Sequence, residues 1–127
     1  MKKILVIDDD PDILTVVRYA LSALPGIEVI TALSGQEGIG KAKEKRPDFI
    51  LLDVRMPSMD GIATYEALQK IPDCKQTPVC FLTAGVQEKE LQEYQAMGVK
   101  CIITKPFDAK ALPQEVQRLW ELYSTNS

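Results

Sequence analysis

Short apolar runs alternate with longer amphipathic stretches along the whole chain. The short runs are rich in Ile, Leu and Val and are bounded by turn residues, a pattern typical of buried β-strands. The stretches between them place apolar residues three and four positions apart, which predicts helices with one buried face. The predicted strands are Lys3–Ile7, Glu28–Ala32, Phe49–Leu52, Val79–Leu82 and Cys101–Thr104.

Capping residues mark the ends of several predicted helices. Ser34 followed by Glu37 has the spacing of a capping box. Gly98 is suited to end the helix before it, because glycine readily adopts the left-handed backbone of a C-terminal cap. Pro113 lacks a backbone N–H, so we expect the last helix to begin late or to have a distorted first turn. Further N-caps are expected at Asp10, Asp60 and Asp108.

The alternation of five strands with five helices predicts one α/β domain. Strands that are apolar on both faces, joined by helices, form a parallel sheet covered on both sides. Right-handed crossovers leave few ways to wind such a sheet. We expect the domain to span residues 1–123, followed by a short flexible tail at 124–127.

Polar side chains that can take part in binding or catalysis follow four of the five predicted strands. In a parallel sheet the strand ends share one edge, and open sheets of this class bind ligands there. The second strand is followed by Ala32 and Leu33 and is expected at the outer edge, away from the site. The candidate residues are Asp8, Asp9 and Asp10 after the first strand, Asp53 after the third, Thr83 after the fourth and Lys105 after the fifth.

Several carboxylates packed together need a proton or a cation to relieve their repulsion. Magnesium suits such a group, since it binds a few carboxylates, waters and a phosphate oxygen. Lys105 adds a positive charge and Thr83 a hydroxyl donor. A carboxylate nucleophile, a metal, an ammonium and a hydroxyl together predict in-line phosphoryl transfer onto an aspartate.

Four segments, in this order, resemble the signature of bacterial response-regulator receivers, the chemotaxis-regulator family. The resemblance covers essentially the whole chain and implies a flavodoxin-like (βα)5 doubly wound sheet with strand order 2-1-3-4-5. It also implies a magnesium-dependent switch of two-component signalling rather than a turnover enzyme. The segments are Ile7-Asp8-Asp9-Asp10, Leu52 to Gly61, Leu82-Thr83-Ala84 and Lys105-Pro106-Phe107.

The resemblance also implies a role for each site residue. Asp53 is expected to accept the phosphoryl group and to bind Mg2+. Asp9 is expected to bind the ion directly, and Asp8 largely through water. The backbone carbonyl of Arg55 completes the implied protein ligands.

Two further residues are implied to contact the phosphoryl group itself. Thr83 is expected to move so that its hydroxyl binds a phosphoryl oxygen, and Lys105 to pair with the group. The Lys105-Pro106 bond resembles the family's cis peptide, which proline makes accessible.

The implied partners are proteins. A sensor histidine kinase or a histidine phosphotransfer domain donates the phosphoryl group, and an effector protein reads the change. The expected output face is the fourth helix, fifth strand and fifth helix, roughly Val86 to Tyr123. Ile102 stands where many family members carry Tyr or Phe, so we expect loop and helix shifts to carry the signal. Arg55 and Gly85 are expected to tune the lifetime of the phosphorylated state.

Composition excludes several other classes. A net charge of −3 and a pI near 5.0 argue against a nucleic-acid-binding face. The apolar runs are too short to cross a bilayer, and no secretory signal opens the chain. Three cysteines without metal-ligand spacing and no histidine make a zinc site unexpected, so reduced thiols and a cytoplasmic location are expected.

Three other functions fit the sequence less well than a phosphoacceptor switch. Aspartate phosphatases of the haloacid-dehalogenase type need a second aspartate two residues after the nucleophile, and Arg55 stands there. A flavin-binding domain needs a phosphate loop after the first strand, where three acidic residues would repel a phosphate. A degenerate receiver acting as a constitutive docking module would lack the acceptor, an acid or the lysine, and all are present. The kinase, the effector, the oligomeric state and any attached domains are left open by the sequence.

Overall fold

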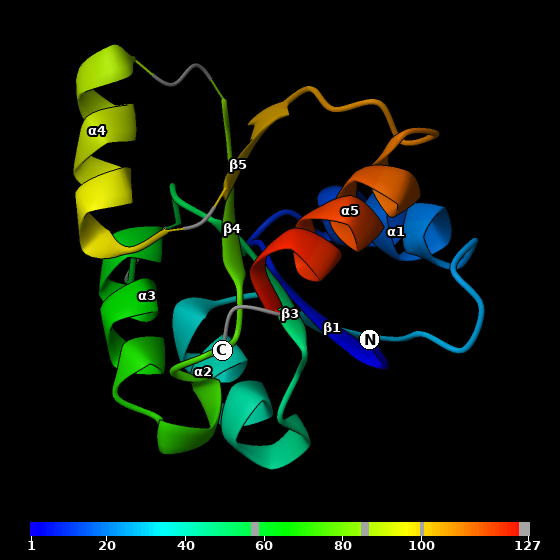
Figure 1. The fold of residues 1–127 in the computed structure, drawn as a ribbon, viewed down its shortest axis with the longest axis horizontal. Helices are drawn as coiled ribbons and strands as arrows, with labels where there is room; N and C mark the ends of the chain where they lie inside the picture. The colour runs from blue at the N-terminus through cyan, green and yellow to red at the C-terminus, as the bar shows by residue number, and fades with distance from the viewer. Residues whose placement is uncertain (57–58, 85–86, 100, 125–127) are drawn as a thin grey trace.

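Five parallel strands form one central sheet in the order β2-β1-β3-β4-β5, as predicted (Figure 1). The computed structural model describes residues 1–56, 59–84, 87–99 and 101–124. Each crossover places a helix over the sheet, and the order reverses between β1 and β3. The strands are β1 Lys3–Ile7, β2 Glu28–Ala32, β3 Phe49–Asp53, β4 Val79–Ala84 and β5 Cys101–Lys105.

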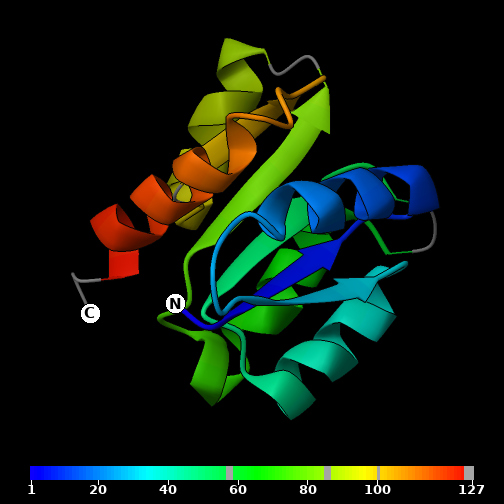
Figure 2. The same cartoon turned by 90° about the vertical axis from the view of Figure 1, so that its right-hand side faces the viewer.

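Helices cover both faces of the sheet. Helices α1 and α5 lie on one face, and α2, α3 and α4 lie on the other (Figures 1 and 2). No helix within the described ranges is long and apolar enough to cross a membrane. The helices are α1 Pro11–Leu21, α2 Gly35–Lys45, α3 Gly61–Gln69, α4 Glu88–Met97 and α5 Leu112–Ser124, with a short 3-10 helix η1 at Pro72–Cys74.

The helix caps largely follow the sequence. The side chains of Asp10, Ser34 and Asp60 accept backbone N–H groups at the starts of α1, α2 and α3. Gly98 ends α4 with a left-handed backbone, at φ 98°. The predicted cap at Asp108 lies one turn before the regular helix: its side chain accepts the N–H of Lys110, and its carbonyl accepts the N–H of Leu112, the first residue of α5.

The last helix begins late, at Leu112, as the presence of Pro113 predicted. The helix then continues to Ser124, one residue into the segment expected to be a flexible tail. Residues 125–127 lie outside the described part of the chain, so most of the predicted tail cannot be compared with the structure.

Two hydrophobic clusters, one on each face of the sheet, make up the core. Phe49 is fully buried in the cluster beneath α1 and α5, and Phe81 is fully buried in the cluster beneath α2, α3 and α4. Cys80 is fully buried in the first of these clusters. Cys101 and Trp120 are partly buried and pack against it.

Close packing of α2 on the sheet explains why Gly38 stands inside a helix, where glycine is ordinarily unfavourable. A Cβ atom at Gly38 would lie 2.3 Å from Cδ1 of Ile7 on β1. The absence of a side chain therefore lets α2 approach the strand that leads into the acidic cluster. Gly40, two residues later and therefore on the opposite side of the helix, has no heavy atom within 4 Å of the corresponding position and serves no such purpose.

Candidate phosphoryl and metal site

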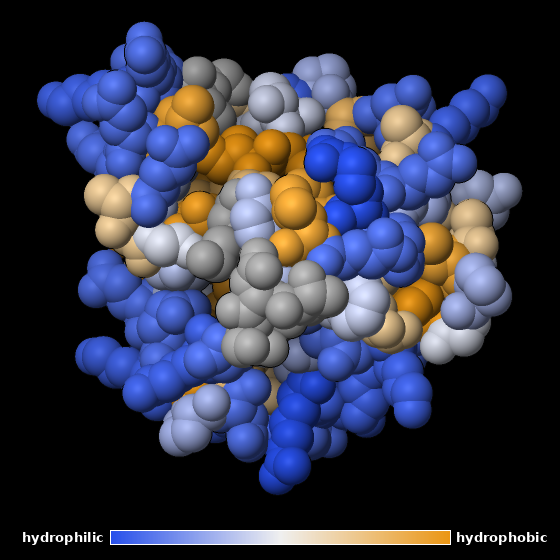
Figure 3. Space-filling model, viewed as in Figure 1, coloured by the Kyte–Doolittle hydropathy of each residue, from blue (hydrophilic) through white to orange (hydrophobic). Residues whose placement is uncertain are grey.

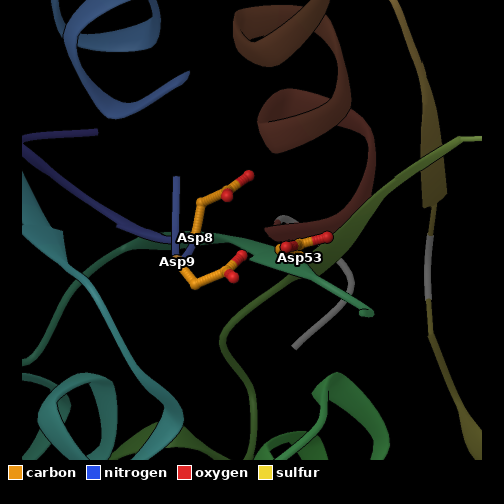
Figure 4. Close-up of side chains that lie close together, drawn as sticks. All are labelled: Asp8, Asp9 and Asp53. Atoms are coloured by element: carbon orange, nitrogen blue, oxygen red, sulfur yellow. The ribbon is translucent and has the colours of Figure 1, made fainter. Parts of the chain in front are cut away.

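The carboxyl ends of the strands bring acidic side chains from β1 and β3 together. Asp8 and Asp9 follow β1 directly, and Asp53 is the last residue of β3. Their carboxylates lie close together at one edge of the sheet (Figure 4). One oxygen from each of the three lies within 4.8 Å of the others. The predicted gathering of these acids is therefore present.

The three acids differ in their exposure. Asp8 is fully buried and Asp53 is 4% exposed, whereas Asp9 is open to solvent. An Oδ1 atom of Asp8 also accepts the backbone N–H of Asp10 at 2.9 Å. The negative charge of buried carboxylates must be balanced by a positive partner or by hydrogen bonds. Because Asp9 is exposed, a cation and its waters can reach the cluster from solvent.

Lys105 supplies part of that compensation. Its Nζ lies 2.8 Å from Oδ2 of Asp8 and 3.5 Å from Oδ1 of Asp53. The ammonium thus bridges β5 to the ends of β1 and β3, with its side chain only 20% exposed. Sequence reasoning placed Lys105 at this edge but did not identify Asp8 as its nearer partner. The sequence indicates this pairing only indirectly: Asp8 directly follows a fully apolar strand, so it is expected to be buried and to need a cationic partner.

The environment shifts the protonation of both groups. Burial, reinforced by the charge of Asp8, raises the pKa of Asp53 from 3.8 to about 6, although Lys105 and the Arg55 backbone act in the opposite direction. Burial alone would lower the pKa of Lys105, but the hydrogen bond and charge of Asp8 outweigh it and raise the pKa overall. The lysine is therefore a permanent cation, while Asp53 retains affinity for a proton or another positive partner.

The hydroxyl-bearing residue predicted on β4 lies beside the acceptor strand. Leu82 pairs with Asp53 across β3 and β4, which places Thr83 one residue beyond the acceptor in register. Thr83 is 3% exposed and pairs with Thr104 on β5. The four predicted side chains Asp9, Asp53, Thr83 and Lys105 thus come from adjacent strands at one edge.

The segment after β3 is held tightly against the site. The N–H of Arg55 donates to Oδ1 of Asp53 at 3.3 Å, and the N–H of Gly61 donates to the carbonyl of Val54 at 2.8 Å. A Cβ atom at Gly61 would lie 2.5 Å from the carbonyl oxygen of Asp53 and equally close to Cα of Val54. The absence of a side chain at Gly61 therefore permits α3 to begin directly behind Asp53.

The remaining features around the site agree with the sequence where the structure describes them. The Lys105-Pro106 peptide bond is cis, as the resemblance implied. In the loop after β3, Met56 is buried and Met59 is partly buried, so these side chains have a packing role. Gly85, which is expected to tune the lifetime of the phosphorylated state, lies outside the described residues. Ile102 packs against the core cluster on the α3 and α4 side of the sheet.

Comparison with known protein families gives an independent result. The sequence matches the family of the response regulator receiver domain over residues 4–117. It is 37% identical over 120 residues to the alkaline phosphatase synthesis transcriptional regulatory protein PhoP of Bacillus subtilis, a match that covers 93% of this chain and 48% of that protein. It is 36% identical over 117 residues to the transcriptional regulatory protein PrrA of Mycobacterium tuberculosis, covering 92% and 49%. The chain therefore spans about half the length of these relatives.

Solved structures agree with the sequence comparison. The chemotaxis protein CheY4 of Vibrio cholerae superposes with a TM-score of 0.87 at 35% identity, covering 94% of this chain and 98% of that one. The signal receiver domain of a signal transduction histidine kinase from Syntrophus aciditrophicus superposes with a TM-score of 0.81 at 30% identity, covering 95% and 91%. The similarity thus extends over nearly the full chain in both sequence and fold.

Proposed function

The chain belongs to the response regulator receiver family, and we propose that Asp53 is the residue on which it receives a phosphoryl group. The observation that carries this proposal is the cluster of Asp8, Asp9 and Asp53, whose oxygens lie within 4.8 Å of one another beside the Lys105 ammonium. Such a cluster can neutralise the charge of a phosphoryl group at the point where it is transferred.

The donor set fits magnesium. All candidate side-chain ligands are carboxylate oxygens, the ligand type that hard divalent cations prefer. Asp9 and Asp53 would hold the ion directly, Asp8 through water, and the backbone carbonyl of Arg55 would complete the protein ligands. A bound Mg2+ supplies charge neutralisation for the phosphoryl oxygens and for the attacking carboxylate. The exposed position of Asp9 leaves room for the waters that Mg2+ retains.

The transfer uses the Asp53 carboxylate as nucleophile. One carboxylate oxygen attacks the phosphorus of a phosphohistidine, a new P–O bond forms and the P–N bond breaks. The imidazole nitrogen keeps the bonding electron pair, and the ring leaves as neutral imidazole because its other nitrogen carries a proton. Asp53 needs no general base, because with a pKa of about 6 its carboxyl is mostly ionised near pH 7.

Thr83 and Lys105 then hold the transferred group. The Lys105 ammonium, already 3.5 Å from Asp53, pairs with a phosphoryl oxygen, and the Thr83 hydroxyl donates a hydrogen bond to another. These contacts exist only in the phosphorylated state, so they favour a conformation that the free protein seldom occupies. The domain is accordingly a switch that is phosphorylated and loses its phosphoryl group to water, rather than a turnover enzyme.

The donor and the receiver of the signal are other proteins. A sensor histidine kinase or a histidine phosphotransfer domain supplies the phosphoryl group, and an effector binds the face formed by α4, β5 and α5. A cytoplasmic location follows from this exchange with kinase domains. We place the domain at residues 1–123. All residues needed for phosphorylation are present, which disfavours a degenerate docking module.

The experiment that tests this function is labelling by acetyl phosphate with Mg2+, read by intact-protein mass. Wild-type protein should gain one phosphoryl group, and Asp53→Asn should gain none. Asp10→Asn is the matched control, because Asp10 is the neighbouring N-cap of α1 and Asn caps helices equally well. Labelling of Asp53→Asn at the wild-type level, or loss of labelling in Asp10→Asn alone, would overturn the assignment.

A further inference from the structure

Three aromatic rings connect α3, β4 and α4 inside the core. The ring of Phe81 lies 5.8 Å from that of Tyr65 at an interplanar angle of 88°, and 4.9 Å from that of Tyr94 at 75°. Both contacts have the edge-to-face geometry that aromatic pairs favour. Phe81 is fully buried, and each tyrosine is 4% exposed. We refer to Tyr65, Phe81 and Tyr94 as the aromatic stack.

Both tyrosines of the aromatic stack involve α4. Tyr94 is part of this helix, and its hydroxyl donates to Oε2 of Glu90 one turn earlier in the same helix, at 3.4 Å. The hydroxyl of Tyr65 on α3 donates to the carbonyl of Met97, the last residue of α4, at 3.2 Å. A Cβ atom at Gly98 would lie 3.1 Å from this same hydroxyl, so the helix end and Tyr65 are in close contact. The bond of Tyr65 to Met97 and the ring contact of Tyr94 with Phe81 therefore join α4 to α3 and β4.

The inner ring of the stack shares a strand face with the threonine of the phosphoryl site. Phe81 and Thr83 are two residues apart on β4, and side chains with that spacing project to the same face. Thr83 is 3% exposed, so any movement of its side chain toward Asp53 changes the packing of a buried face. Close-packed interiors respond to such a change by shifting neighbouring groups rather than by leaving a void.

The strand next to β4, β5, carries no aromatic side chain that could pass on a movement of Thr83. Ile102 pairs with Phe81 across β4 and β5 and packs on the same core cluster. The rings that lie between β4 and the helices on this face are instead those of the aromatic stack. On this face, Phe81 is therefore the ring on β4 that contacts α4, through Tyr94.

We propose that Phe81 is the relay through which the position of the Thr83 side chain sets the position of α4. The proposal rests on the proposed function, because it requires a phosphoryl group on Asp53 to draw Thr83 toward it. Hydrophobic side chains reach the surface over β5, between α4 and α5 (Figure 3). A shift of α4 would alter the outline of that surface, which adjoins the expected output face.

Hydrogen exchange across residues 88–97 tests the relay, with beryllofluoride and Mg2+ as the stable substitute for the phosphoryl group. In wild-type protein the exchange rates of this helix should change when beryllofluoride binds. In Phe81→Leu the change should shrink about fivefold, while acetyl phosphate still labels Asp53 at a rate near that of the wild type. Tyr94→Leu removes the other ring of the closer contact and should have the same effect, so the test does not depend on one variant folding.

Phe49→Leu is the matched control, because Phe49 is equally buried but lies on the opposite face of the sheet. This variant should retain both labelling and the exchange response of α4. An undiminished response in Phe81→Leu or Tyr94→Leu would overturn the relay and leave the phosphoacceptor assignment intact. An equal loss in Phe49→Leu would also overturn it, since general softening of the core would then explain the result. Absence of labelling and of any response in wild-type protein would overturn the proposed function, and the relay with it.

Discussion

At the scale of single residues, the site is a set of buried acids balanced by one ammonium. Asp8 is fully buried, Asp53 nearly so, and Lys105 lies within ion-pair distance of both. Two carboxylates with one lysine leave an excess of negative charge in a region of low dielectric. Burial, together with the neighbouring charge of Asp8, accordingly raises the pKa of Asp53.

The pKa of Asp53 predicts a pH-dependent gain in stability for Asp53→Asn when Mg2+ is removed by a chelator. The folded protein holds this proton up to about pH 6, whereas an unfolded aspartate releases it near 3.8. The folded state therefore binds more protons in this window, and the contribution of Asp53 to stability is lost as pH rises through about 6. Asparagine cannot ionise, so the variant should exceed the wild type by up to about 3 kcal/mol at neutral pH and by little near pH 4.

Urea denaturation at several pH values measures this difference. Asp10→Asn serves as the control and should show no comparable trend, because Asp10 is exposed at the start of α1. A stability difference between Asp53→Asn and the wild type that stays constant from pH 4 to pH 7 would contradict the explanation, as would a difference of opposite sign.

The ion pairs of Lys105 lead to a second prediction. Lys105→Met should lower the free energy of unfolding by about 3–5 kcal/mol without Mg2+, because buried Asp8 then loses its cationic partner. Added Mg2+ should recover more stability in this variant than in the wild type, since the cation no longer competes with an ammonium. Denaturation with and without Mg2+ measures both effects. Lys110→Met, at an exposed position near the start of α5, should change neither quantity; an equal Mg2+ response in Lys105→Met and the wild type would contradict the account.

At the scale of secondary-structure elements, the site depends on how closely α3 begins behind β3. Gly61 is the first residue of α3, and the backbone of Asp53 and Val54 occupies the space where its Cβ would lie. This contact couples the start of the helix to the acceptor. The caps at Asp10 and Asp60 fix the starts of α1 and α3 in the same region. The elements around the site are thus positioned by side-chain caps and by one close backbone contact at Gly61, which a side chain there would disturb.

Gly61→Ala should therefore weaken both stability and labelling. The added methyl group must displace backbone rather than a flexible side chain, which we expect to cost about 1–3 kcal/mol and to slow phosphorylation by acetyl phosphate. Gly40→Ala is the matched control within a helix, where the new Cβ meets no atom within 4 Å. That variant should gain about 0.5–1 kcal/mol, because alanine favours the helix over glycine. Thermal or urea unfolding, together with the labelling rate, separates the two cases; normal labelling and stability in Gly61→Ala would be inconsistent with this role.

At the scale of the whole molecule, the sequence predicted the strands, their parallel arrangement and the edge at which the acids meet. These features follow from apolar runs, caps and the common direction of parallel strands, all of which are local properties. The late start of α5 was also predictable from Pro113. The turn at Asp108 was not, because the same residue type stabilises a turn and a helix start equally well. The partner of Lys105 and the aromatic stack depend on contacts across the fold, and no local pattern specifies which side chains meet there.

The central claim is that one phosphoryl group is shared by Asp53, a magnesium ion, Thr83 and Lys105. A crystal structure of the beryllofluoride complex with Mg2+ tests it most directly. The account predicts beryllium bound to a carboxylate oxygen of Asp53, with separate fluorines contacting the metal, the Thr83 hydroxyl and the Lys105 ammonium. Beryllofluoride absent from Asp53, or bound there with Thr83 and Lys105 out of contact with it, would contradict the account.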